Sequence, residues 1–262
     1  GMATRLLSRA VRHHVENIYA LVRVADEIVD GSAAEAQAKG ADLDPEAELN
    51  AFEQETYRAM QLGFSTNLII HAFAITAREV GISKDIVEPF FHSMRQDLTE
   101  TEHDQASFDT YVYGSAEVVG LMCLAAFVHG ESYTKEQKVA LVKGARALGS
   151  AFQKVNFLRD LSADFKRLGR SYFPNVNVSN FDESTKARLV ADINADLEIS
   201  AKSLPLLPRS ARPAVTAAQL LFTELNHKIG NTDAKKLIET RISVGNFKKL
   251  WLLAKSFLGA KP

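Results

Sequence analysis

The stretch QKVNFLRDLSADFKRLGRSY, residues 153–172, combines a helical apolar pattern with an unbroken polar stripe. Within it, Gln153, Asn156, Asp160 and Asp164 are spaced by three, four and four residues, so one face of a helix carries all of them. The other faces of that helix receive apolar side chains, namely Leu148, Phe152, Val155, Leu158 and Phe165. The stretch therefore predicts a long, packed helix with one polar face.

This polar stripe has the donor types of a metal site. An amide oxygen followed by two carboxylates at successive turns can hold a divalent cation. Lys166, Arg167 and Arg170 follow directly and bring cations that can bind phosphate oxygens. The alternative is an ordinary solvated helix face, which the high density of charge also fits.

Helical spacing of apolar residues extends over almost all of the 262 residues. The first helix carries one apolar face with Leu7, Val11, Val15, Ile18, Val22 and Val29. Further helices are predicted over 47–62, 66–80, 84–98, 107–129, 135–168, 184–203, 214–228 and 234–257. Helix starts are predicted at Ser83, at Thr134 with Gln137, and at Asp182.

Strand signals are nearly absent, and neither a repeat nor a linker divides the chain. Residues 31–48 are small, polar and rich in Ala, Gly and Asp, so they predict a mobile loop. We therefore expect one all-α domain of nine or ten helices over residues 1–262.

A second polar stripe lies near the start of the chain, where Asp26 and Asp30 are four residues apart and share a helix face. Arg23 precedes them by one turn. Two carboxylates this close repel each other unless a cation lies between them, and Mg²⁺ typically takes one or two carboxylates together with substrate phosphate. The alternative is a solvated helix end in which Arg23 and Glu27 form a surface ion pair.

The two stripes together favour a phosphate-binding cavity more strongly than either does alone. Each joins acids to arginines, as carboxylate–metal–diphosphate contacts require, because acids hold the metal while the metal and the arginines hold phosphate. Two such helices far apart in the chain suggest facing walls of one cavity, although the spacing does not establish that they meet.

Composition excludes several other classes of protein. The net charge of −1 gives no overall attraction for nucleic acid or anionic membranes. The single cysteine, Cys123, excludes a disulfide framework and fits a reducing cytoplasm. No charge-free apolar stretch reaches the roughly 20 residues that span a bilayer.

At these residues the sequence resembles the squalene/phytoene synthase family, and bacterial phytoene synthases most of all. The two stripes are similar to the family's paired aspartate-rich motifs, and the second continues into Gly169-Arg170-Ser-Tyr172-Phe-Pro174. Further matching segments are Arg5 to Arg9, Met94 to Leu98, Tyr113 to Met122 and, more weakly, Arg241 to Lys248. The resemblance implies an isoprenoid-synthase-type helical bundle around a central cavity.

The resemblance also assigns roles to individual residues. It implies that Mg²⁺, with Mn²⁺ as a substitute, is bound from two walls by Asp26, Asp30, Asn156, Asp160 and Asp164. It implies that diphosphate or its prenyl chain is contacted by Tyr19, Arg23, Tyr113, Gln153, Arg159, Arg170 and Tyr172. Catalysis would rest on the four aspartates together with Arg23.

The implied reaction joins two prenyl diphosphates head to head. Loss of diphosphate from the donor leaves an allylic cation, the acceptor double bond attacks it, and a cyclopropylcarbinyl diphosphate forms. A second ionisation and rearrangement then give phytoene from geranylgeranyl diphosphate. We expect a cytoplasmic protein that makes peripheral membrane contact, because substrate and product are oily. Phytoene formation is expected to need no nicotinamide cofactor, and we expect no nucleic-acid partner.

Two alternatives to phytoene synthesis remain open at this point. One is a squalene or dehydrosqualene synthase that uses C15 substrate. The other is a catalytically silent relative acting in assembly, which the retained acids argue against. Departures from the family pattern are Glu27, Glu117 and Ala163. Glu117 replaces a usual glycine and would narrow the pocket or place a charge beside it. The sequence also starts after the point where the family supplies a Ser-Phe segment that covers the diphosphates, which puts full activity in doubt.

Aromatic and histidine residues add little at the level of sequence. Six phenylalanines on apolar helices either line the cavity or, as we favour, belong mostly to the core: Phe73, Phe90, Phe91, Phe127, Phe157 and Phe222. Four histidines lack the spacing of a metal site and do not suit Mg²⁺, so we interpret them as structural or surface residues: His13, His14, His71 and His92.

Overall fold

The structure, a computed structural model, describes residues 6–168, 172–176, 179–240, 242, 243 and 245; at Ala34 and at 162–168 it describes the backbone only. The elements are α1 (Arg9–Val29), α2 (Ser32–Ala38), α3 (Pro45–Leu62), α4 (Leu68–Val80), α5 (Lys84–Thr99), α6 (Gln105–Val112), the π-helix η2 (Tyr113–Glu117), α7 (Val118–Val128), α8 (Lys135–Leu168), α9 (Glu183–Ser203), the 3₁₀ turn η3 (Leu204–Leu206), α10 (Arg212–Gly230) and α11 (Ala234–Leu237). The described residues contain no strand. The prediction of an all-α fold is confirmed.

Side-chain caps fix several of the helix starts that the sequence predicts. The Thr134 N–H donates to Gln137 Oε1 at 3.0 Å and the Gln137 N–H donates to Thr134 Oγ1 at 3.2 Å, which completes a capping box before α8. The Asp182 carboxylate accepts the Thr185 N–H at 2.8 Å at the start of α9. Ser83 precedes α5 without a side-chain cap bond.

Two predicted segments differ from the structure. Residues 31–48 do not form a continuous loop, because they contain α2 and the first turn of α3. Glu27 holds the start of α2 by accepting both the backbone N–H and the hydroxyl of Ser32, at 3.0 and 2.9 Å. The helix predicted over 234–257 is described only as α11, and residues 246–262 lie outside the described part of the chain.

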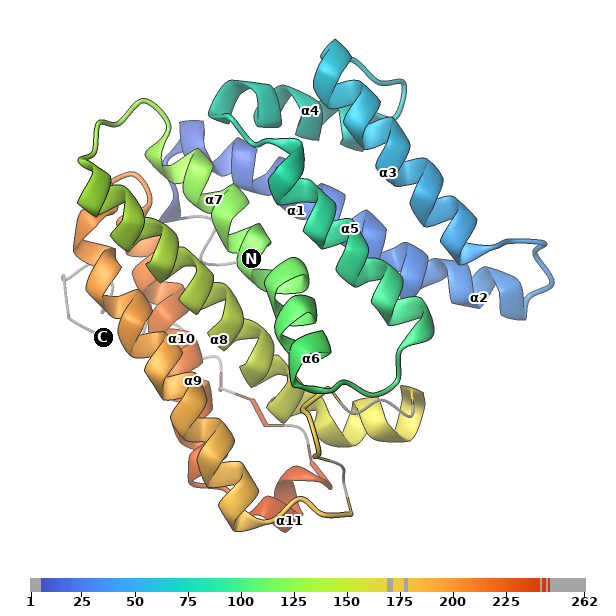
Figure 1. Cartoon of the computed structure of the whole chain (residues 1–262), viewed down its shortest axis with the longest axis vertical. Helices are drawn as coiled ribbons and strands as arrows, with labels where there is room; N and C mark the ends of the chain where they lie inside the picture. The colour runs from blue at the N-terminus through green and yellow to red at the C-terminus, as the bar shows by residue number, and fades with distance from the viewer. Residues whose placement is uncertain (1–5, 169–171, 177–178, 241, 244, 246–262) are drawn as a thin grey trace.

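The helices form two packed groups, each with its own core (Figure 1). The first core joins α1, α3, α4, α5 and α7 and includes the fully buried rings of Phe73, Phe90 and Phe91. The second core joins α8, α9 and α10 and takes in Phe173 and Val176 from the segment after α8. The cavity lies where α1 and α7 of one group face α8, α9 and α10 of the other.

One continuous helical run, α6–η2–α7, lines this cavity. It covers Gln105–Val128 and, by length and composition alone, is long and apolar enough to cross a membrane. Its π-helical register accompanies a hydrogen bond from the Ser93 hydroxyl of α5 to the Tyr111 carbonyl, at 3.2 Å. Glycines let the run approach α8 closely: a Cβ on Gly120 would lie 2.7 Å from the Ala145 carbonyl oxygen, and one on Gly149 would lie 2.6 Å from that of Ala116.

Candidate active site

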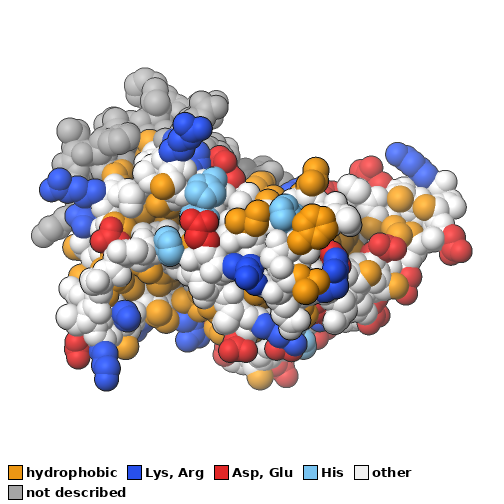
Figure 2. Space-filling model, turned by 90° about the horizontal axis from the view of Figure 1, so that it is seen from above, with side chains coloured by type: hydrophobic (Ala, Val, Ile, Leu, Met, Phe, Trp, Pro, Cys, Tyr) orange, Lys and Arg blue, Asp and Glu red, His pale blue; other side chains and the backbone are white. Residues whose placement is uncertain are grey.

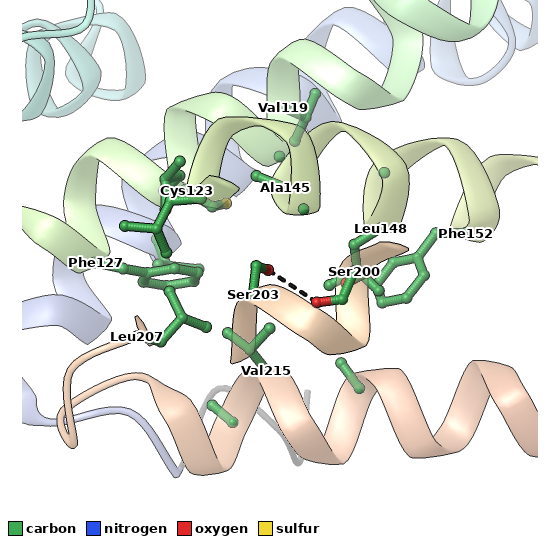
Figure 3. Close-up of a pocket in the computed structure, with 18 of the residues that line it drawn as sticks. Val119, Cys123, Phe127, Ala145, Leu148, Phe152, Ser200, Ser203, Leu207 and Val215 are labelled. Atoms are coloured by element: carbon green, nitrogen blue, oxygen red, sulfur yellow. Dashed lines mark hydrogen bonds between the residues drawn. The ribbon is translucent and has the colours of Figure 1, made fainter. Parts of the chain in front are cut away.

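The central feature is an apolar cavity of about 400 Å³. Figure 3 shows side chains from α7, α8, α9 and α10 converging on it, among them Cys123, Phe127, Leu148, Phe152 and Val215. Helix α1 contributes Val15 and Val22 to the lining. Such a chamber keeps water from an oily ligand.

The two polar stripes begin at the same end of this cavity. Leu7, just before α1, and Leu141, near the start of α8, both belong to clusters that Phe127 joins, so they lie at one end of the cavity, here called the far end. Val22 of α1 and Phe152 of α8 are the lining residues furthest along each helix from that end. Thus α1 and α8 run in the same direction along the cavity, which extends about 16 Å between Leu141 and Phe152 at 1.5 Å per helical residue.

The acids follow one turn beyond the near end on both walls. Asp26 lies four residues after Val22, and Asn156 lies four residues after Phe152. Asp30 and Asp160 come a further turn along. The approach of the two stripes at one end of the cavity stays a prediction, which the positions of α1 and α8 allow.

On α1, Asp26 lies where the ionised form of its carboxyl group is disfavoured. Limited access to solvent raises its pKa to about 6; Arg23 lowers it, and Asp30 and Glu27 raise it further. The nearest Arg23 nitrogen lies 3.8 Å from the Asp26 carboxylate. A cation beside Asp26 and Asp30 would relieve this repulsion.

Arg23 and Tyr19 are exposed residues of α1. The Arg23 guanidinium pairs with Glu27, so the surface ion pair considered from the sequence is present. The Tyr19 side chain is 65% exposed. Both side chains are therefore accessible to a ligand that approaches the near end of the cavity, here called its mouth.

On α8, Gln153, Asn156, Arg159 and Asp160 are all half-buried. Arg159 donates to the neighbouring Asp160 carboxylate at 2.5 Å. Asp164 lies in the last turns of α8, where side chains are not described, and Arg170 lies outside the described residues.

Tyr172 returns to α8 and joins an aromatic stack. Its ring lies 4.1 Å from that of Phe157, almost parallel, and 5.6 Å from that of Tyr111. The Tyr111 hydroxyl donates to the buried Asp97 carboxylate at 2.7 Å. Burial first, and then Asp97, raise the pKa of Tyr111 well above its usual value, and Asp30 is close enough to contribute. This stack therefore joins α6 to α8 through Tyr111, Phe157 and Tyr172.

Tyr111 and Asp97 were not among the residues that the sequence predicted for the site. The segment Met94 to Leu98 was noted for its resemblance, but nothing in its spacing shows that Asp97 turns inward. A carboxylate inside an otherwise apolar helix face is the signal that could have found it.

Tyr113 and Glu117 lie on η2. The Glu117 carboxylate accepts a hydrogen bond from Arg146 of α8 at 2.6 Å, and Arg146 also lies over the Tyr113 ring at 5.0 Å. Glu117 is absent from the lining of the cavity. Its charge is matched by Arg146, and its side chain does not line the cavity that it was expected to narrow.

Of the six phenylalanines considered for the lining, Phe127 contacts the cavity. Phe73, Phe90 and Phe91 are fully buried in the first core. Phe157 belongs to the stack with Tyr172, and Phe222 stacks on Phe152 at 3.7 Å. The interpretation of most of these rings as core is confirmed.

The donors at the mouth fit Mg²⁺ chemically. They are carboxylate and amide oxygens, which hard cations prefer, and Mg²⁺ commonly completes its shell with phosphate and water. Asp26 with Asp30 on one wall and Asn156 with Asp160 on the other suit such a partial shell. Burial is the largest cause of the raised pKa of Asp26, and a cation bound beside its carboxylate would lower that pKa again.

Comparisons with known proteins identify a family and named relatives of this chain. The family described as "Squalene/phytoene synthase" matches residues 2–248. Phytoene synthase 1 of Zea mays is 27% identical over 96% of this chain and 63% of its own length. The 15-cis-phytoene synthase of Pantoea ananas is 26% identical over 87% of this chain and 76% of its own. The chain thus spans less than two thirds of the maize relative.

Solved structures show the same fold. A dehydrosqualene synthase crystallised with a ligand superposes with a TM-score of 0.76 at 19% identity, covering 98% of this chain and 90% of that one. A squalene synthase from Alicyclobacillus acidocaldarius gives 0.73 at 19% identity, with 92% and 89% covered.

Proposed function

Because the chain belongs to the squalene/phytoene synthase family, we propose that it is a prenyltransferase that joins two prenyl diphosphates head to head and releases pyrophosphate. The further proposal is that the substrate is geranylgeranyl diphosphate and the product phytoene, formed through a cyclopropylcarbinyl diphosphate. The named relatives support C20 chemistry, since they are phytoene synthases. The proposal is supported by an apolar cavity whose lining includes Val22 on α1 and Phe152 on α8, each one helical turn before the acid stripe of its helix.

The residues at the mouth would divide the work between metal and phosphate. Asp26 and Asp30 from α1, and Asn156, Asp160 and Asp164 from α8, would hold Mg²⁺. When bound, Mg²⁺ would supply positive charge to the diphosphate. Arg23, Arg159 and Arg170 would grip the diphosphate oxygens, and Tyr19 and Tyr172 would position them by hydrogen bonds.

The apolar cavity would protect the allylic cation. Its lining presents no ionised thiol that could attack the cation, because burial raises the pKa of the Cys123 thiol to about 12. The prenyl chain would extend away from the acids, past Val119 and Cys123, towards Leu207. Tyr113 and Gln153 would border the reacting carbons.

The test is direct. The protein is incubated with Mg²⁺ and a mixture of C15 and C20 prenyl diphosphates, pyrophosphate is measured, and apolar products are identified by mass. Asp26→Asn and Asp160→Asn are each expected to lower turnover by about 100-fold or more, with helicity unchanged. Glu198→Gln, at an exposed acid of α9, is the matched control.

Each outcome decides between the alternatives. A C40 product supports phytoene synthesis, and a C30 product assigns the chain to C15 chemistry. Absence of pyrophosphate and product, also with a version extended upstream, would leave the silent-relative hypothesis. Wild-type rates in both aspartate variants would remove those residues from the metal role.

A further inference from the structure

A group of three metal-ligand side chains lies far from the acid stripes. The possible ligand atoms of His13, His14 and Glu79 all lie within 4.8 Å of one another. His13 and His14 are in the second turn of α1, and Glu79 is in the last turn of α4. Because His14 precedes Asp26 by 12 residues, the two places are about 18 Å apart along α1. Figure 2 shows histidine side chains beside acidic atoms on this face of the molecule.

The distance between His14 and Glu79 suits an ion better than a direct bond. His14 Nε2 and Glu79 Oε1 are 3.5 Å apart, longer than the roughly 2.9 Å of a good N–H···O hydrogen bond. In a tetrahedral zinc site with bonds of about 2.0–2.1 Å, neighbouring ligand atoms are about 3.4 Å apart. The pair thus already has the separation that two ligands of one zinc ion require.

In both rings Nδ1 has a polar partner, as the nitrogen that does not bind the metal usually has in metal-binding histidines. His13 Nδ1 lies 3.4 Å from the Arg9 carbonyl oxygen. Because a carbonyl can only accept, this long contact favours the tautomer with the proton on Nδ1, which leaves the Nε2 lone pair for a metal. Metal-bound histidines typically donate their second N–H to such a carbonyl, hydroxyl or carboxylate.

His14 is held in the same way by α4. Its Nδ1 lies 3.1 Å from Thr76 Oγ1, which also accepts the Asn17 amide at 3.0 Å. In the tautomer in which His14 Nδ1 donates to this hydroxyl, the bare Nε2 of His14 faces Glu79, as a metal site requires. Only 4% of the His14 surface is exposed, so the ring has little freedom to turn away.

We propose that His13, His14 and Glu79 bind a borderline divalent transition metal, with Zn²⁺ the best match, and that this ion joins α1 to α4. Two imidazoles and one carboxylate are a ligand set that zinc accepts and Mg²⁺ does not favour. The fourth position falls to water or to His129, which is exposed at the end of α7 with its ring centroid 6.4 Å from that of His14. The role is structural, and it does not depend on the proposed prenyltransferase activity.

The experiment measures Zn²⁺ binding to tag-free protein that has been stripped with a chelator. Titration calorimetry is performed in excess Mg²⁺, so that the acid stripes do not compete, and thermal unfolding is followed with and without Zn²⁺. Visible absorption of added Co²⁺ reports tetrahedral nitrogen and oxygen ligation. We expect one Zn²⁺ per chain and a higher unfolding temperature in its presence.

The variants use the two exposed ligands, because replacing buried His14 could disturb folding. His13→Ala and Glu79→Gln are each expected to weaken Zn²⁺ binding by about tenfold or more and to abolish the thermal shift. His92→Ala, an exposed histidine of α5, is the control and should bind as the wild type does. The proposal is overturned if saturable binding is absent, or if His13→Ala and Glu79→Gln bind as tightly as His92→Ala.

Discussion

The close approach of η2 to α8 makes Gly149 the most informative position for a stability test. An added Cβ at Gly149 would lie 2.6 Å from the Ala116 carbonyl oxygen and 3.0 Å from the Glu117 Cα. Both atoms belong to backbone, so neither can swing away as the end of a flexible side chain would. Gly149→Ala therefore forces α8 and η2 apart.

The expected size follows from two opposing effects. Replacing a helical glycine by alanine gains roughly 0.5–1 kcal/mol from reduced chain entropy. Overpacking of a well-packed interior costs about 1–3 kcal/mol. Because the contact involves backbone, we expect the second effect to prevail, with a net loss of about 1–2 kcal/mol. At about 2–4 °C per kcal/mol, the unfolding temperature should fall by about 2–8 °C.

Gly230→Ala is the matched control. Gly230 ends α10, and an added Cβ would meet only the Val190 side chain at 3.4 Å, an ordinary contact. This variant should be as stable as the wild type or slightly more stable. Urea unfolding followed by far-ultraviolet circular dichroism gives both free energies, and equal stability of the two variants would refute the backbone contact between η2 and α8.

Three further predictions concern single side chains. Because burial raises the pKa of Cys123 to about 12, its alkylation by iodoacetamide at pH 8 should be about a thousandfold slower in folded protein than in urea, where the pKa is about 8.5; equal rates would contradict its burial. Tyr111→Phe removes the donor to buried Asp97 and should cost about 1.5–3 kcal/mol of unfolding free energy, whereas a loss below 0.5 kcal/mol would show that this bond is not made. Burial acts to lower the pKa of Lys154, but its bonds to Asp192 and Asp196 prevail and raise it. The stabilisation is therefore present below the unfolded pKa of about 10.4 and lost as pH rises through the higher folded pKa. Wild type should lose stability relative to Lys154→Met as pH rises above about 10.4, and parallel profiles would count against the ion pairs.

Most helix positions could be predicted because they depend on local signals. The capping box of Thr134 with Gln137 and the cap at Asp182 act within one turn, and apolar periodicity marks the long helices. Helix α2 was missed because seven residues form a helix too short to be stable alone. It depends on Glu27, which contacts Ser32 in three dimensions.

The site was predictable where a single helix carries the pattern. Asp26 with Asp30, and Asn156 with Asp160, show their shared faces by spacing alone. Tyr111 was not found, because its partner Asp97 comes from another helix. The roles predicted for the five metal ligands, Asp26, Asp30, Asn156, Asp160 and Asp164, and for the diphosphate-binding residues stay proposals.

The glycine contacts between α6–η2–α7 and α8 have a consequence for redesign of the chamber. Carbonyl oxygens touch the opposite helix at Gly120 and Gly149, so the breadth of the chamber is set by peptide groups that have no rotamers to exchange. Its depth, in contrast, is bounded by the side chains of Phe127, Leu141 and Leu207, which substitution can shorten or lengthen. Variants that accept longer or shorter hydrocarbon tails should therefore arise at these side chains, while the glycines tolerate little change.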